Sequence, residues 1–131
     1  MNQFNVRTSG TLEFIDITTE VQNIIDGSGV KQGVCHIYIP HTTAAITINE
    51  HADPSVVEDI TTVLEKIIPA SGNYRHVEGN SAAHVKASLF GSNQTVIIED
   101  GKLVLGTWQG IFFCEFDGPR KRQVLVKVVS D

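Results

Sequence analysis

The sequence predicts a single α+β domain over residues 1–131, and three observations lead to this prediction. Short segments in which apolar and polar residues alternate, as they do in half-buried strands, occur along most of the chain. Two segments with helical spacing of apolar residues lie in its middle, and a shorter helix is expected near its start. With 131 residues, 41% of them hydrophobic, the chain can bury one core. Many strands with two or three helices make an α+β domain.

The first half of the chain is predicted to hold four strands and one short helix. Alternating side chains place the strands at 4–7, 12–17, 34–39 and 45–50. The helix is expected to have Thr18 or Thr19 as its N-cap and to end in the glycine-rich segment 27–29. Cys35 and Cys114 lie in apolar strand contexts and match no Cys-x-x-Cys pattern, so both are interpreted as buried free thiols.

Two helices are predicted in the middle of the chain. The longer one begins at Asp53, an N-cap residue followed by proline, and Pro69 ends it. Four residues at helical spacing are expected to form its apolar stripe, which three others widen: Val56, Ile60, Val63 and Ile67, then Val57, Leu64 and Ile68. A loop follows to about Gly79. The shorter helix is expected to begin at Asn80 or Ser81 and to end at Gly91.

The last third of the chain is predicted to be strand. Asp100-Gly101 is a strong two-residue hairpin signal, which would place Glu99 opposite Lys102 and Ile98 opposite Leu103. Two longer strands are expected after it, at 108–116 and 122–129. In the first, one face would carry Trp108, Phe112, Cys114 and Phe116, and in the second, one face would carry Val124, Val126 and Val128.

Composition and charge exclude several classes of function. No apolar run approaches the ~20 residues of a membrane span, and the first residues do not resemble a signal peptide, so a cytoplasmic protein without a membrane partner is expected. A net charge of -5 argues against nucleic-acid binding. The basic segment 119–122 is a local exception that favours an anionic ligand. The sequence lacks the glycine-rich phosphate loop of many nucleotide enzymes, which argues against an NTPase.

Three of the five histidines are the candidates for a functional site. His41, His76 and His84 each stand at the end of a predicted element or in a loop, and imidazole is both a common metal ligand and a proton carrier near neutral pH. Three histidines with an open position are typical of catalytic zinc. The spacing alone favours a simpler alternative, in which the histidines form separate hydrogen bonds at a polar edge. His36 is interpreted as a structural strand residue, and His51 is left open between a capping or surface role and ligation.

Polar neighbours strengthen two of these candidates. Thr42 and Thr43 follow His41 directly, and their hydroxyl and N–H groups suit an anion or an oriented imidazole. Asn80, His84 and Ser88 recur at every fourth residue, which makes one polar stripe on the shorter helix.

Carboxylates and a basic turn complete the set of candidates. Glu50 and Asp59 are expected to orient an imidazole or to complete a metal site, with surface charge as an equal alternative. Glycines flank Trp108 and Gln109, which would let a ligand or another backbone approach closely. The turn at 117–119 would present Arg120 as a two-pronged phosphate ligand, or as a solvated residue of a plain hairpin.

These segments together resemble the YjbQ family. Six motifs carry the resemblance in the family's order: 41–50, Asp53-Pro54 with Asp59, 74–76, 83–91, 105–110 and 117–120. The resemblance implies a mixed, mostly antiparallel sheet curled around two or three helices, assembly as a homotrimer, and a metal or anion pocket near the subunit boundary. It places His41, His76 and His84 on the family's histidine positions. It also places other polar and glycine residues on family positions: Glu50, Asp59, Ser88, Gly91, Gln109 and Arg120.

The activity that the resemblance implies is a secondary thiamine phosphate synthase, a transferase. Such an enzyme couples hydroxymethylpyrimidine diphosphate to thiazole phosphate and releases diphosphate, so small phosphorylated metabolites are the expected ligands. His41 and His84, with Glu50 and Asp59, would be catalytic, and Thr42, Thr43, Ser88, Gly91, Gln109 and Arg120 would bind substrate or phosphate. The cofactor would be a divalent metal, zinc on the three histidines or Mg²⁺ with the diphosphate. The alternatives are a metal-dependent hydrolase of a small phosphorylated substrate and a trimeric phosphometabolite-binding protein without catalytic activity.

Overall fold

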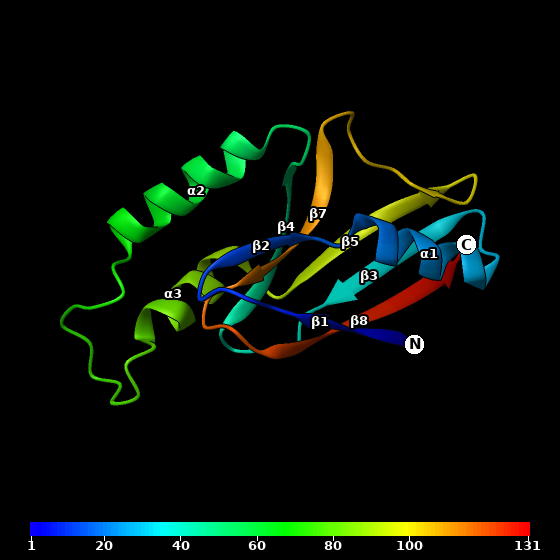
Figure 1. Ribbon diagram of the computed structural model, residues 1–131. Helices are drawn as coiled ribbons and strands as arrows, with labels where there is room; N and C mark the ends of the chain where they lie inside the picture. The colour runs from blue at the N-terminus through cyan, green and yellow to red at the C-terminus, as the bar shows by residue number, and fades with distance from the viewer.

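The strands form two antiparallel sheets that face each other across a shared core. The computed structural model describes residues 1–131. Its elements follow in the order β1 (Asn2–Arg7), β2 (Glu13–Asp16), α1 (Thr18–Ser28), β3 (Gly33–Tyr38), β4 (Ala44–Glu50), α2 (Pro54–Ile67), α3 (Ser81–Phe90), β5 (Asn93–Glu99), β6 (Lys102–Leu103), β7 (Gln109–Glu115) and β8 (Lys121–Ser130) (Figure 1). The predicted α+β class is confirmed.

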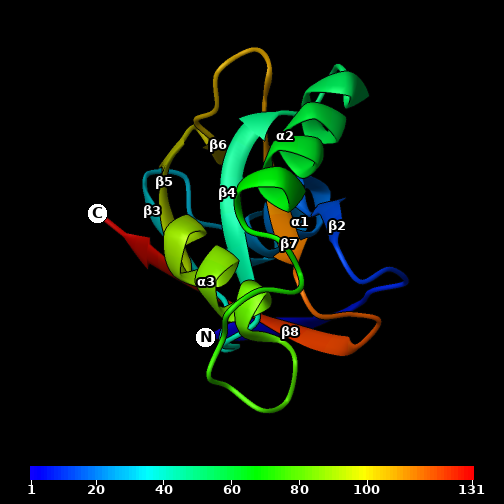
Figure 2. The same ribbon diagram turned by 90° about the vertical axis from the view of Figure 1, so that its left-hand side faces the viewer.

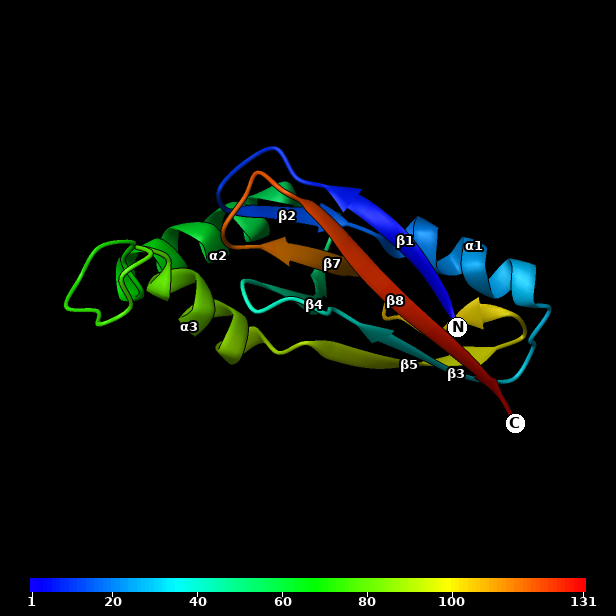
Figure 3. The same ribbon diagram turned by 90° about the horizontal axis from the view of Figure 1, so that it is seen from below.

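The two sheets differ in size and are joined along one edge. Five strands form the larger sheet in the order β1-β8-β3-β5-β6, and three form the smaller in the order β2-β7-β4. Every pairing is antiparallel. The N–H of Ile46 on β4 donates to the carbonyl of Gly91, which precedes β5, at 3.2 Å. The two sheets therefore meet beside the end of α3, where β5 begins (Figure 3).

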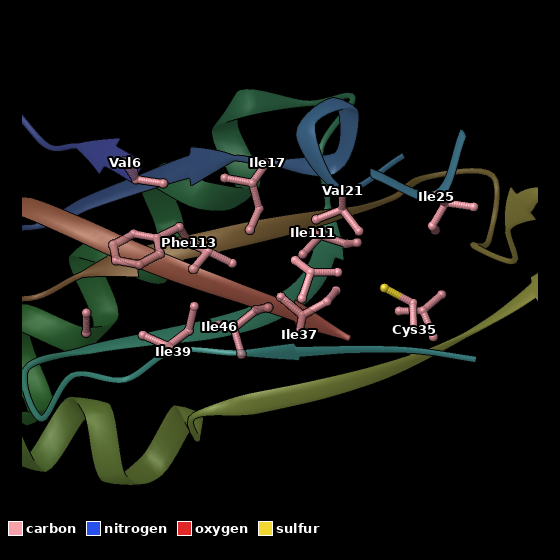
Figure 4. Close-up of a cluster of buried hydrophobic side chains, with 14 of the residues drawn as sticks. Val6, Ile17, Val21, Ile25, Cys35, Ile37, Ile39, Ile46, Ile111 and Phe113 are labelled. Atoms are coloured by element: carbon pink, nitrogen blue, oxygen red, sulfur yellow. The ribbon is translucent and has the colours of Figure 1, made fainter. Parts of the chain in front are cut away.

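The main core fills the space between the two sheets and is closed by α1. The inward residues of β3 and β8, such as Ile37 and Val126, meet Ile46 of β4 and Phe113 of β7, and none of the four is exposed to solvent. Figure 4 shows Val21 and Ile25 of α1 entering this cluster from the side. Full burial of one such side chain contributes about 1.5–3 kcal/mol, which makes this cluster the principal source of stability.

A second cluster lies on the other face of the smaller sheet, under α2 and α3 (Figure 2). Four phenylalanine rings meet there edge to face, with centroid separations between 5.2 and 6.4 Å: Phe14, Phe90, Phe112 and Phe116. The predicted stripe of α2 is wrong in part. The helix packs with Val57, Ile60, Leu64 and Ile68, whereas Val63 and Ile67 are 53% and 65% exposed.

The outer face of the larger sheet has no helix over it (Figure 3). Tyr38, Ile97 and Val129 project from β3, β5 and β8 and are 47%, 60% and 40% exposed. The register of strand pairing places these three residues on one side of the sheet. The buried Cys35 and Val96 lie on the opposite side. An apolar surface is therefore left uncovered in the single chain.

Local turn and cap predictions had mixed outcomes. The hairpin at Asp100-Gly101 is confirmed: both residues have positive φ, 52° and 76°, and the pairs Glu99–Lys102 and Ile98–Leu103 form. Asp53 caps α2 as predicted, accepting a hydrogen bond from the Ser55 N–H at 3.0 Å. The predicted threonine cap of α1 is wrong, because Thr18 is already the first helical residue.

Both cysteines are buried free thiols, as predicted. Burial raises the pKa of Cys35 to about 11 and also raises that of Cys114, so neither thiol is a nucleophile near neutral pH. None of the three helices combines the length and the apolar character that crossing a membrane requires.

Candidate functional site

Two of the predicted histidines line one pocket. His41 follows β3 in the segment that turns into β4, and His84 lies in the first half of α3. Their pocket has a volume of about 370 Å³ and is also lined by Thr42, Ser88 and Gly91, together with Ser92. Five residues predicted from separate motifs are thus brought together in one chain.

The third histidine, His76, reaches the same region through His84. The two rings are nearly perpendicular, at 83°, with centroids 5.4 Å apart. His76 comes from the loop between α2 and α3, and its Nε2 lies 3.7 Å from the Glu78 carboxylate. His84 also lines a neighbouring pocket with Tyr74, Arg75 and His76, so this one side chain separates two adjoining cavities.

A backbone hydrogen bond orients the ring of His41. Its Nε2 accepts the N–H of Gln123 on β8 at 2.9 Å, which leaves the proton of the neutral imidazole on Nδ1. Partial burial and the positive charge of Arg122 lower the pKa of His41, and the opposing charge of Glu115 offsets only part of that shift. His41 is therefore a neutral hydrogen-bond donor at physiological pH.

A buried ion pair lies directly behind this histidine. Glu115 accepts hydrogen bonds from Arg122 and from the Thr8 hydroxyl, the latter at 2.8 Å, and Arg122 also donates to the Thr43 Oγ1 at 2.9 Å. The Asp117 N–H donates to the same carboxylate at 3.0 Å. Burial alone would raise the pKa of Glu115, but the hydrogen bonds and charge of Arg122, with those other donors, outweigh it and lower the pKa. The pair is ionised at neutral pH.

This network explains why Thr42 and Thr43 play different parts. Both threonines were predicted to hold an anion, but only Thr42 lines the pocket. Thr43 is 6% exposed, and its hydroxyl accepts from Arg122, so it faces the interior. Arg122 precedes Gln123 on β8. The ion pair thus fixes the segment that carries His41 and the strand whose N–H orients its ring.

A small basic pocket lies one strand step away. Arg7, Arg120 and Lys121 line a cavity of about 250 Å³. Lys121 lies two residues before Gln123 on β8, about 7 Å along the strand, and the backbone N–H of Gln123 donates to the ring of His41. Arg120 is partly engaged already: its Nε and Nη2 donate to the carbonyl and carboxylate of Asp117 at 2.8 and 3.0 Å. The predicted exposure of Arg120 by a turn is therefore found, with one edge of the guanidinium held by that turn.

Three predicted site residues lie elsewhere in the single chain. Glu50 and Gln109 are opposite each other at the far end of β4, whose seven residues span about 20 Å from the end near His41. Glu50 accepts the Ala52 N–H at 2.8 Å, and Gln109 accepts the Gly106 N–H at 2.8 Å. Asp59 is exposed on α2 and does not line the histidine pocket.

The structure explains why a glycine, Gly110, follows Gln109. The ring of His51 packs so closely on Gly110 that a Cβ at this position would overlap it. His51 in turn pairs with Asp16, with Nδ1 and Oδ2 2.8 Å apart. The close approach expected at these glycines is thus made within the chain by a histidine side chain.

The three histidines do not form a metal-binding set on their own. No group of three or more His, Cys, Asp or Glu side chains is arranged to hold a metal ion in one chain. The Nε2 of His41 accepts a hydrogen bond from a backbone N–H, so only Nδ1 of this ring is left to bind a metal ion. The predicted zinc centre stays a prediction that requires ligands from outside the single chain.

Three contributors to this region escaped the sequence predictions: Thr8, Arg7 and Glu115. Arg122 was expected to favour an anionic ligand as part of the basic segment 119–122, but it is buried and paired with Glu115. Glu115 and Arg122 carried a recognisable signal, because each is a charged residue flanked by apolar or strand residues and aligned with the buried positions of its strand. Charges at such positions are almost always paired. Thr8 offered no local signal, because its partners Glu115 and Arg120 are more than 100 residues away in sequence.

Known proteins match the chain over nearly its whole length. The family described as UPF0047 protein YjbQ-like matches residues 2–131. A UPF0047 protein of Methanocaldococcus jannaschii is 54% identical over 98% of this chain and 94% of its own length, and the UPF0047 protein YugU of Bacillus subtilis is 48% identical over 99% of both.

Solved structures agree with these matches. A crystal structure of an uncharacterised conserved protein of the YjbQ/UPF0047 family from Clostridium acetobutylicum has a TM-score of 0.97 and 56% identity, covering 98% of this chain and all of that one. A protein of unknown function from Sulfolobus solfataricus has a TM-score of 0.95 and 38% identity, covering 99% and 96%.

Proposed function

The chain belongs to the UPF0047 family of YjbQ-like proteins, and from this premise we propose that it is a transferase with thiamine-phosphate-synthase-like activity. It would couple hydroxymethylpyrimidine diphosphate to thiazole phosphate. The observation that carries the proposal is the convergence of His41, Thr42, His84 and Ser88 on one pocket of about 370 Å³, beside a basic pocket. A pocket with hydroxyl and imidazole groups suits a diphosphate, and the adjoining basic residues suit a second phosphate.

The reaction needs little from the protein beyond positioning and charge stabilisation. The bond between the pyrimidine methylene and the diphosphate oxygen breaks, the diphosphate leaves with the electron pair, and the thiazole nitrogen forms a new bond to the methylene carbon. Holding both substrates in line removes much of the entropic barrier. Donors aimed at the departing diphosphate stabilise the charge that develops on its oxygens.

Named residues could supply these donors. His41, neutral with its proton on Nδ1, can donate to a phosphate oxygen without a change of protonation state. The Thr42 hydroxyl is the second donor on the same segment. His84, beside His76, can donate to the leaving diphosphate from the helix side of the pocket. Arg7, Lys121 and the free edge of Arg120 would bind the phosphate of the thiazole substrate.

A divalent metal and a trimeric assembly remain part of the proposal. A metal ion, zinc or the Mg²⁺ that accompanies a diphosphate, would supply further charge stabilisation, with ligands from the substrate or a second subunit besides the histidines. Glu50 and Gln109 lie at the opposite end of β4 from His41, so they can join the same site only when another subunit brings them there. The exposed apolar residues Tyr38, Ile97 and Val129 support such an assembly, because burial of apolar surface drives association.

A coupling assay tests the proposal. Purified protein is incubated with the two substrates and Mg²⁺, and thiamine phosphate is measured by chromatography. We expect product with the wild type, none with His84→Ala, and wild-type rates with Lys66→Ala, which removes an exposed side chain from α2. Equal product from His84→Ala and the wild type, or none from the wild type, would remove the argument.

The alternatives give different results in companion measurements. Hydrolysis of unrelated phosphoesters that is lost in His41→Ala would identify a hydrolase instead. Calorimetric binding of inorganic diphosphate that is lost in His84→Ala, with no turnover of any phosphorylated substrate, would identify a binding protein without catalytic activity.

A further inference from the structure

A second cavity lies between α2 and α3, apart from the histidine pocket. Its volume is about 440 Å³, within the range of small-molecule sites. Polar side chains reach it from both helices and from the end of β7: Glu65, Asn80, Lys86 and Asp117. Leu12 and Phe116 are among the apolar side chains of its wall. The two helices that border it can be followed in Figure 2.

Lys86 is the most unusual of these side chains, because its stem is largely buried while its accessible amino group forms no hydrogen bond or ion pair within the chain. It is 6% exposed, and none of the four ion pairs of the chain includes it. Side chains of a helix lean toward its N-terminus, so Lys86 extends over the first turn of α3, where Ala82 and Ala83 form the wall of the cavity. Its amino group therefore belongs to the cavity, where a ligand can receive its hydrogen bonds.

Asn80 borders the same cavity, but its unused acceptor is enclosed by the protein. Its Nδ2 donates to the Asp117 carboxylate at 2.9 Å, but its Oδ1 is buried and accepts no hydrogen bond. A buried carbonyl oxygen without a partner costs about 1–3 kcal/mol. Asn80 Oδ1 is fully enclosed, so a ligand in the cavity does not reach it, whereas the amino group of Lys86 is accessible from the open space.

The site is separate from the histidine pocket because α3 divides them. Residues two apart on a helix differ by about 200° in direction, so His84 and Lys86 point to nearly opposite sides. His84 lines the pocket with His41, and Lys86 lines the cavity with Glu65. The two sites have no lining residue in common, so a substitution in one site does not touch the other directly.

We propose that this cavity binds a small dipolar metabolite of the α-amino acid class, with its carboxylate on Lys86 and its ammonium group on Glu65. The N-terminal end of α3 adds partial positive charge on the side of the carboxylate. Glu65 faces it from α2, and the charge of Asp117 is already matched by Arg120. Lys86 and Glu65 thus give the cavity one positive and one negative charge that are not joined in a direct ion pair, which matches a zwitterion. Leu12 and Phe116 offer an apolar surface for its side chain.

The test uses L-leucine as the probe and follows backbone amide signals of the full chain by NMR. L-Leucine should shift the signals of Asn80, Ala82, Ala83 and Phe116 in a saturable manner. 4-Methylpentanoate and 3-methylbutylamine each keep one of the two charged groups, and both should bind at least about tenfold more weakly. Lys86→Met keeps the length and the apolar stem of the side chain and should lose leucine binding by a similar factor. His84→Ala should bind leucine as the wild type does.

Three results would overturn the proposal. The first is the absence of any shift at these amides up to about 10 mM leucine, which corresponds to an affinity too weak for a built site. The second is equal binding by Lys86→Met and the wild type. The third is equal binding of leucine and 4-methylpentanoate by the wild-type chain, which needs no variant and would reduce the cavity to a simple anion site.

Discussion

Arg122 and Glu115 form a buried ion pair, in which the carboxylate side chain is fully shielded and that of the arginine is 6% exposed. The other three ion pairs of the chain are considerably more exposed. The pair joins β7 to β8 and, through Thr43, to the segment that carries His41. Its integrity should therefore affect both stability and the histidine pocket.

Removing one member of this pair should destabilise the fold strongly. Glu115→Gln leaves Arg122 with an uncompensated buried charge, and breaking a buried pair in this way costs about 3–5 kcal/mol. Urea denaturation followed by circular dichroism measures the change. Glu99→Gln, at an exposed position of β5, is the matched control and should change stability by less than about 0.5 kcal/mol. A loss below about 1 kcal/mol in Glu115→Gln would contradict the assigned role of the pair.

The same carboxylate should make stability fall in acid. The pKa of Glu115 is lower in the folded chain than its ordinary value of 4.5. Below pH 4.5 the unfolded chain takes up the proton first, so stability decreases until the pH has also passed the folded-state pKa. Denaturation curves at several pH values between 7 and 3 should show this decrease. A Glu115→Gln chain should show a smaller decrease over the same interval, and parallel curves for the two chains would assign the acid sensitivity to other groups.

Arg120 should tolerate even a conservative change poorly if it binds phosphate. The substitution Arg120→Lys keeps the positive charge. It removes the planar guanidinium, one edge of which holds Asp117 while the other can bind a phosphate. We expect affinity for a phosphorylated substrate to fall about three- to tenfold, measured by calorimetry. Lys127→Arg, at an exposed position of β8, should have no effect. Unchanged affinity in Arg120→Lys would show that Arg120 serves only its own turn.

Lys86 should limit the stability of the ligand-free chain. Burial lowers the pKa of Lys86, and the charge of Glu65 offsets that shift only in part, so the charged amine is unfavourable in the folded state. Lys86→Met should therefore raise the free energy of unfolding by up to about 1 kcal/mol, because the apolar stem is kept and a charge that burial disfavours is removed. Thermal unfolding at pH 7 provides the comparison, with Lys66→Met on the exposed side of α2 as the control. A less stable Lys86→Met chain would indicate a hidden partner for the amine.

Mixing two inactive variants tests whether subunits share a site. Glu50 and His84 lie at opposite ends of β4 within one chain, so a common site needs two subunits. Glu50→Gln and His84→Ala should each lose coupling activity. Unfolding and refolding an equimolar mixture should restore part of it, because some shared sites then contain both native residues. Two variants that stay inactive together, in assemblies shown to have exchanged subunits, would place Glu50 outside the site.

The parts of the fold that could be predicted depend on local chemistry. The hairpin follows from two adjacent residues that tolerate positive φ, and the start of α2 from an aspartate followed by proline. The buried face of α2 could not be predicted in the same way. Seven apolar residues form two overlapping stripes on this helix, and only the position of Phe14 and Phe116 beneath it decides that Leu64 and Ile68 are buried while Val63 and Ile67 are not.

The candidate site shows the same division. His41 and Thr42 were predicted because polar residues follow the end of a strand, and His84 and Ser88 because they continue a polar stripe on a helix. These four residues do line one pocket. The inward rotation of Thr43 was missed because its partner, Arg122, is 79 residues away. Lys86 was missed because a lysine on a helix is ordinarily solvated, and its burial depends on how α2 lies over α3.

The antiparallel pairing of β1 with β8 brings both chain ends to one end of the larger sheet, away from the loop between α2 and α3 (Figure 1). A short glycine- and serine-rich linker could therefore join Asp131 to Met1, and the chain could be reopened at Gly72. The core between the two sheets would keep every strand pairing in such a circular permutant. The helices on either side of the Lys86 cavity would become the opposite termini of the polypeptide, which makes their relative position adjustable by design.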